Sequence, residues 1–159
     1  MMVWVAMLTL VCAALLGLKR ARRIHCANIG EGQHDGVITY KTDAASAPRF
    51  LLGKIGTDAA HVAVSGIGDI PLGVITDEAA AAEELVTLAL FGSYDTTLKV
   101  VASGAIVAGA FVVGDAGGKV RTLPVTAGTY YIVGRALNAA AADGDIVEID
   151  PIPCVQRVV

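Results

Sequence analysis

The chain has 159 residues, 55% of them hydrophobic but with only three Phe, four Tyr and one Trp, which predicts a single domain with a core of small apolar side chains. The formal net charge is −3, and the first 26 residues hold four basic side chains and no acidic one, so the remainder is more acidic still. This balance argues against a surface that binds nucleic-acid phosphates directly.

Residues 1–26 differ in composition from everything that follows. An uncharged apolar run extends from Met2 to Leu18, and the basic stretch KRARR comes directly after it. As a helix this run would be about 26 Å long, which is marginal for a bilayer. It is open to three interpretations: a membrane anchor with the body in the cytoplasm, a signal-like segment that is removed, or an extension outside any folded domain. We favour the last and do not expect membrane binding.

Residues 27–48 are rich in glycine, polar and weakly patterned. Only the stretch GVITYKT, at Gly36–Thr42, alternates between apolar and polar residues, and it does so weakly. The glycines make this region flexible and its polar side chains keep it soluble. We therefore expect residues 27–48 to be an extended arm, and residues 49–159 to form one β-rich domain.

The rest of the chain has the pattern of short strands separated by Gly and Asp turns. Strands are expected at Arg49–Gly56, His61–Gly66, Leu98–Ser103 and Val155–Val159, with a hairpin at Ala110–Pro124 whose turn is DAGG. Together with the segments between them, these make about nine or ten strands. The expected fold is mostly β, a small β-barrel or a β-sandwich with an extended N-terminal arm and little helix.

One phrase occurs twice. LGVITDEAAAAEELVTLAL, from Leu72, aligns without gaps on VGRALNAAAADGDIVEIDP, from Val133, so that Gly73 meets Gly134 61 residues further on. Each copy runs from an apolar stretch through alanines into strict alternation, which predicts strand, alanine-rich crossing and strand. The alanines also permit a helical turn, although Gly144 weakens a helix in the second copy. The alternative to a repeated unit is chance similarity in an alanine-rich chain.

Residues that could carry chemistry are scattered. The cysteines and histidines lack the spacing of metal ligands, and Cys154 is expected to be a packed thiol. The adjacent His34 and Asp35 would point to opposite sides of an extended segment, and GDAGGKV lacks the glycine and hydroxyl residue of a phosphate loop. We therefore predict no catalytic residue, no metal site and no cofactor.

The acidic residues near the C-terminus allow two interpretations. Asp143, Asp145, Glu148 and Asp150 are calcium-ligand types, but their alternation along a predicted strand favours a solvated face.

The order of several segments resembles a known family. ANIGEGQHDGVITYKTDAA is followed by RFLLGKIGTDAAHVAVSG, PLGVITDEAAAAEE, VVASGAIVAGAFVVGDAGGKVRTLP and GTYYIVGRALNAAAADGDIVEI. This series resembles the capsid cement, or head decoration, proteins of tailed phages. Relatives begin near ANIGEG, which is why residues 1–26 are interpreted as an extension.

The resemblance implies a structural protein without catalytic residues or cofactor. It implies binding to the outer surface of the capsid in the virion, bridging of neighbouring major capsid protein subunits, stabilisation of the DNA-filled head, and a homotrimer. We expect the arm to pair with capsid strands and to bury four side chains, those of Ile29, Val37, Ile38 and Tyr40. The main alternative is a small β-domain binding protein anchored in a membrane by residues 2–18, and a small β-barrel enzyme is a second.

Overall fold

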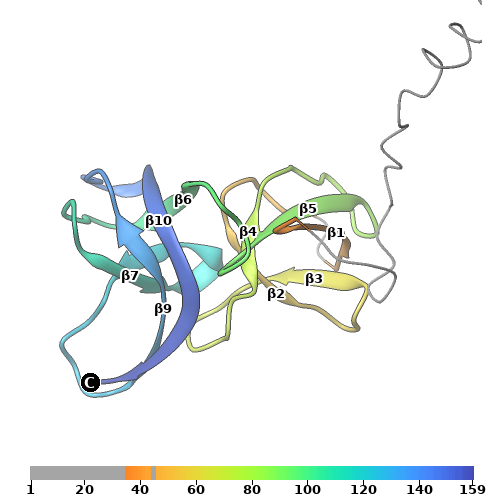
Figure 1. Cartoon of the computed structure of the whole chain (residues 1–159). Helices are drawn as coiled ribbons and strands as arrows, with labels where there is room; N and C mark the ends of the chain where they lie inside the picture. The colour runs from red at the N-terminus through yellow and green to blue at the C-terminus, as the bar shows by residue number, and fades with distance from the viewer. Residues whose placement is uncertain (1–34, 44–45) are drawn as a thin grey trace, which may run out of the picture.

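The computed structural model describes residues 35–43 and 46–159, which form ten strands and one short 3-10 turn. These elements are β1 (Val37–Thr42), β2 (Leu52–Ile55), β3 (His61–Val64), β4 (Gly73–Ile75), β5 (Leu85–Leu90), β6 (Leu98–Ser103), β7 (Phe111–Gly114), η1 (Ala116–Gly118), β8 (Val120–Thr122), β9 (Thr129–Ala136) and β10 (Asp143–Val158). Strands β1–β5 close into one barrel and β6–β10 into a second, and the two lie side by side (Figure 1). The expectation of a mostly β fold with a barrel and little helix is confirmed.

The second barrel repeats the topology of the first. Around the first barrel the strands follow the order β1-β3-β2-β4-β5, and the second has the corresponding cyclic order β6-β8-β7-β9-β10. The β1–β3 and β6–β8 pairs are parallel and every other pair is antiparallel. The repeated phrase in the sequence is therefore the best preserved part of a larger unit, a complete five-stranded barrel that is used twice.

The alanine-rich phrase forms the same turn in both barrels, and it is not helical. Glu84 accepts hydrogen bonds from the backbone N–H groups of Ala80 and Ala81, at 2.7 and 3.2 Å. Asp145, 61 residues further on, accepts the corresponding bonds from Ala141 and Ala142 at 2.8 and 2.9 Å. A carboxylate that satisfies two turn N–H groups favours this turn over the helix that the alanines alone would permit.

The same turn contains a strained residue in only one of the barrels. Glu83 has φ = 67°, a left-handed conformation that costs a non-glycine residue about 1 kcal/mol or more. Gly144 is its counterpart in the second barrel and has φ = 90°, which glycine adopts without that penalty. The first barrel thus keeps a side chain at a position where the backbone favours glycine.

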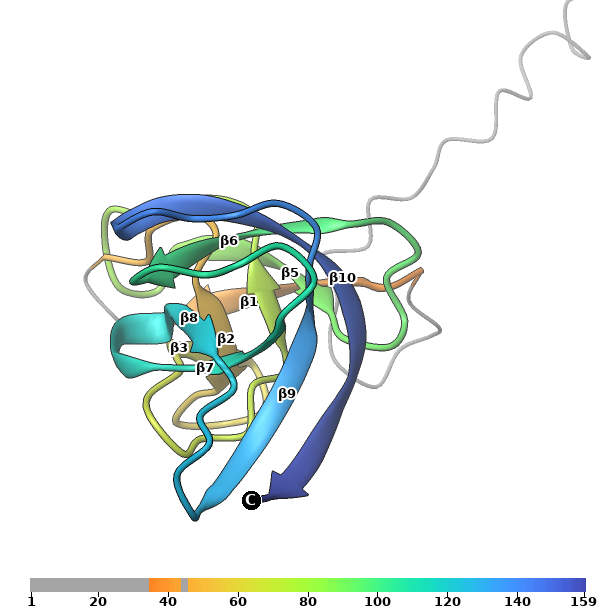
Figure 2. The ribbon, with the colours of Figure 1, turned by 90° about the vertical axis from the view of Figure 1, so that its left-hand side faces the viewer.

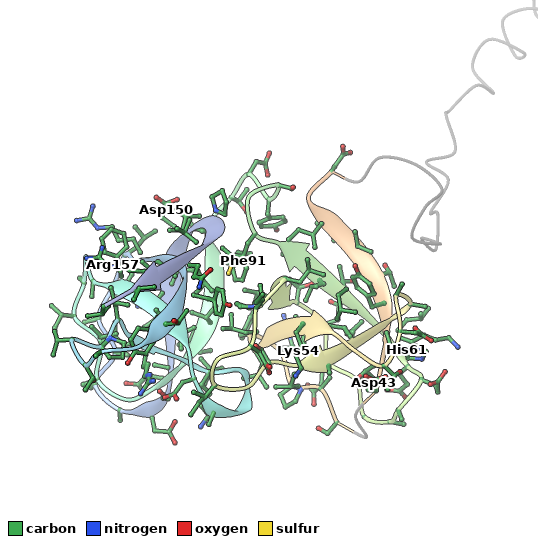
Figure 3. All side chains as sticks on the ribbon, turned by 90° about the horizontal axis from the view of Figure 1, so that it is seen from below. Asp43, Lys54, His61, Phe91, Asp150 and Arg157 are labelled. Carbon is green, nitrogen blue, oxygen red and sulfur yellow. The ribbon has the colours of Figure 1, made fainter. Side chains whose placement is uncertain are left out.

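The two barrels are packed together through an apolar junction. The core of the second barrel includes three fully buried residues of the first, Leu52, Val74 and Ala89. Two backbone hydrogen bonds cross the junction: Val101 N–H donates to Phe50 O at 3.0 Å, and Gly118 N–H donates to Ser65 O at 2.7 Å. Phe91, at the start of the connection between the barrels, also packs against the second core (Figure 3).

The longest strand, β10, has a different partner in each of its halves. Asp143–Ile149 pairs with β6, whereas Ile149–Val158 pairs with β9, with an irregularity between Pro151 and Val155. The β9–β10 pair continues past the barrel wall as a twisted ribbon that ends near the C-terminus (Figure 2). The strand expected at the C-terminus is the last part of β10, and the ribbon brings that end of the chain beside the loop that precedes β9.

The structure corrects the expected division at residue 48. Val37–Thr42 is strand β1 of the first barrel, paired with β5 along its length and with β3 at its end. The boundary between arm and β-domain therefore falls inside a barrel, and the expected single domain consists of two barrels. Alternation is weak in β1 because the polar Thr42 occupies a buried position there, with an exposed fraction of 1%.

Candidate interaction surface

Exposed apolar side chains gather at one part of the surface. Five large apolar residues in the described part of the chain are more than 60% exposed, and four of them lie on the β3–β4 loop, the β8–β9 loop or the end of β10. These are Ile67 (64%), Ile70 (63%), Val125 (95%) and Val158 (74%), and we call this region the loop face. Large apolar residues that cluster while fully hydrated indicate a surface that becomes covered by a partner.

Hydrogen bonds hold the loops that present these side chains. In the β3–β4 loop, Asp69 accepts a hydrogen bond from Gly66 N–H at 2.6 Å and an ion pair from Lys54 at 2.7 Å. In the β8–β9 loop, Tyr130 Oη donates to Thr126 O at 3.2 Å. These bonds use the polar groups of each loop internally, so the apolar side chains are left facing outward.

A shallow cleft lies between the two loops. Its walls come from both barrels and include Ile67 and Asp69 from the first, with Arg121, Tyr130 and Tyr131 from the second. The Arg121 guanidinium lies 6.0 Å from the centre of the Tyr130 ring. Tyr and Arg are the residue types that contribute most to binding when a partner covers them. The cleft exists only because the barrels are joined, since neither barrel supplies both walls.

A charged cluster occupies the end of the first barrel, far from the second (Figure 3). His61 Nδ1 lies 2.6 Å from Asp58 Oδ1, and its Nε2 lies 3.0 Å from Glu83 Oε1. Glu83 also accepts a hydrogen bond from Lys41 Nζ at 2.9 Å. The bonds to Asp58 and then to Glu83 raise the pKa of His61, because they favour the protonated imidazole. The strained Glu83 thus connects β1 to β3.

The side chains predicted to contact a partner are not gathered at one site. Tyr40 is only 4% exposed and belongs to the core of the first barrel, so its prediction as a contact residue is wrong for the folded barrel. Val37 is 36% exposed and Ile38 packs against the same core. Ile29 lies outside the described residues.

The residues of the loop face were not predicted from the sequence. Ile67 and Ile70 occur in SGIGDIP, and Val125 occurs in LPVTAG. Each is a single apolar residue within a segment of turn-forming residues, where no strand would bury it. That isolation was the available signal, but it does not show that the two loops meet.

The remaining candidates for chemistry are accounted for by local structure. Cys154 is a free thiol, half-buried beside the second core, and burial raises its pKa. Asp143 pairs with Lys119 at 2.7 Å, and Asp145 caps its turn. The part of the chain that the structure describes contains no group of three or more His, Cys, Asp or Glu side chains placed to hold a metal ion.

Among these same residues no helix is long and apolar enough to cross a membrane. The apolar run at Met2–Leu18, like His34, Cys12 and Cys26, lies outside the described residues.

Comparisons with known proteins agree with the architecture. The family model described as "Phage cement protein" matches residues 32–151. No curated protein matches the sequence. The crystal structure of the head fiber gp8.5 N base in bacteriophage phi29 superimposes with a TM-score of 0.57 at 14% sequence identity, covering 76% of this chain and 98% of that one. At this low identity the structural likeness shows a common fold and nothing further.

Proposed function

The chain belongs to the phage cement protein family, and from this premise we propose that it binds the major capsid protein on the assembled shell and stabilises the DNA-filled head. The protein is located in the virion, at the outer surface of the capsid. We propose that its role there is structural and not enzymatic.

The physical basis of this stabilisation is linkage. A ligand that binds the assembled shell and not its free subunits lowers the free energy of the assembled state alone. The shell then resists dissociation by an amount that grows with the affinity and with the number of copies bound. A compact body of two fused barrels suits this task because its rigid junction transmits force between its contacts.

The loop face is the observation that carries the contact. Ile67, Ile70, Val125 and Val158 are exposed to an extent that only a covering partner would relieve. Burying about 100 Å² of apolar surface contributes about 2.5 kcal/mol, so these four side chains offset much of the cost of immobilising the protein. We propose that this face sits against the capsid.

Two parts of the sequence-based hypothesis remain in the proposal. A homotrimer fits a site of local three-fold symmetry, because closed symmetric association lets each copy make the same contacts. Residues 27–36, which precede β1, supply a second contact by pairing with capsid strands, with Ile29 as the apolar anchor. Val37, Ile38 and Tyr40 are no longer part of this contact, since β1 belongs to the first barrel.

The test uses the full-length protein and capsids that lack it. Sedimentation after mixing should show saturable binding with a fixed ratio of copies to capsid subunits, and decorated capsids should withstand higher temperature before releasing DNA. Ile67→Ser/Val125→Ser should weaken binding, whereas Val107→Ser, which changes an equally exposed residue outside the loop face, should not. Absence of binding by the unaltered protein would refute the proposal.

A further inference from the structure

The cation in the cleft of the loop face lacks a close partner. The Nε atom of Arg121 is buried and has no hydrogen-bond partner among the described residues. The carboxylate nearest to it is that of Asp115, 3.8 Å away, and Asp115 already accepts a hydrogen bond from Ser103 Oγ at 2.6 Å. A buried donor of a charged group that remains unsatisfied costs free energy that an incoming acceptor would recover.

The carboxylate in the cleft is already engaged. Asp69 binds Lys54 at 2.7 Å and Gly66 N–H at 2.6 Å, so it is turned toward its own loop. Arg121 is therefore the group of the cleft that has bonding capacity to offer, and it is positively charged. The chain as a whole carries a net charge of −3, so this cleft differs in sign from the average surface.

The surroundings of Arg121 favour an ionic contact. The guanidinium lies beside the Tyr130 ring, with Tyr131 and Ile67 also lining the cleft. A partner seated on this apolar rim excludes water, and a charge-assisted hydrogen bond strengthens as the local dielectric falls. Arg also presents a planar array of donors that matches a carboxylate in two-point geometry.

We infer that the loop face recognises an acidic segment of the capsid protein, with an Asp or Glu side chain that enters the cleft and accepts hydrogen bonds from Arg121. This inference rests on the proposed function and names the chemistry of its partner. The apolar rim supplies most of the affinity, whereas Arg121 selects for a carboxylate and sets the orientation of the partner.

The experiment measures binding of full-length protein to capsids that lack it, over a series of salt concentrations. Arg121→Gln should weaken binding by about tenfold at low salt and reduce the salt dependence of the affinity. Arg121→Lys should fall between the two, because it keeps the charge but loses the fork. Lys99→Gln, which removes an exposed cation outside the cleft, is the matched control and should behave as the unaltered protein.

The outcomes separate the inference from the function on which it rests. If the unaltered protein binds and Arg121→Gln binds equally well at every salt concentration, the inference is wrong while the capsid-binding function stands. If the unaltered protein does not bind, both fail. If Arg121→Gln instead changes the oligomeric state of the free protein in sedimentation equilibrium, the carboxylate belongs to a second copy, and the inference is overturned. Urea unfolding of each variant verifies that the barrels are intact.

Discussion

Gly73 and Gly134 occupy the same place in the two barrels, yet replacing each with alanine should have unequal costs. A Cβ atom at Gly73 would overlap the backbone oxygen of Ala89 and lie 3.1 Å from Leu90 Cα, both in the paired strand β5. At Gly134 it would lie 2.7 Å from Asp150 O and 3.0 Å from Ile149 Cδ1, a side-chain atom that can move.

The magnitudes follow from what has to shift. At Gly73 only backbone can give way, so overpacking and weakened β4–β5 hydrogen bonds cost about 2–3 kcal/mol, against which the reduced entropy of the unfolded chain returns less than about 1 kcal/mol. We therefore expect Gly73→Ala to destabilise by about 2 kcal/mol and Gly134→Ala by about 1 kcal/mol.

Equilibrium unfolding in urea measures these differences, and Gly104→Ala is the matched control. A Cβ at Gly104 would meet no atom within 4 Å, and its φ is not left-handed, so that variant should be neutral or slightly stabilised. The denaturation midpoints should rank Gly104→Ala above Gly134→Ala and Gly134→Ala above Gly73→Ala, at similar slopes. A Gly73→Ala variant as stable as Gly104→Ala would refute the close approach of β4 and β5.

Two further predictions concern the first barrel. Hydrogen bonds to Asp58 and Glu83 raise the pKa of His61, so its stabilising effect is complete below its ordinary value near pH 6.5 and is lost as the pH rises through the raised value. The melting temperature of the unaltered protein relative to His61→Gln should fall across that window, and a constant difference would count against the cluster. Removing residues 1–26 should leave the melting temperature unchanged, whereas removing residues 1–42 deletes β1 and should unfold the first barrel; equal stability of the two truncations would contradict its closure.

Much of the fold was accessible because local pattern and backbone geometry agree. The alternation in LVTLAL predicts β5, and the DAGG segment predicts the turn between β7 and β8. The repeat was detected where a carboxylate, two alanine N–H groups and a close backbone approach all constrain the same stretch. Elsewhere the two barrels share topology with little sequence likeness, because many apolar side chains fill a small barrel equally well.

The proposed contacts could not be predicted in the same way. The arm was extended too far because β1 places Thr42 inward and so lacks the alternation of a half-buried strand. The loop face joins Ile67 to Tyr130, residues whose proximity depends on how one barrel is set against the other. No periodicity within either segment encodes that arrangement.

By itself the sequence determined the β class, the doubled alanine turn and the family resemblance, since each depends on residues near one another in the chain. Only the tertiary structure decided that each copy closes into a separate barrel, that β1 is a wall of the first, and that Arg121 lies in a cleft between two exposed loops. The physical reason is that strand closure and barrel packing depend on pairings between distant residues, such as Tyr40 with Val86 and Val101 with Phe50. The free energy of those pairings depends on the whole assembled core and not on the local pattern of either segment.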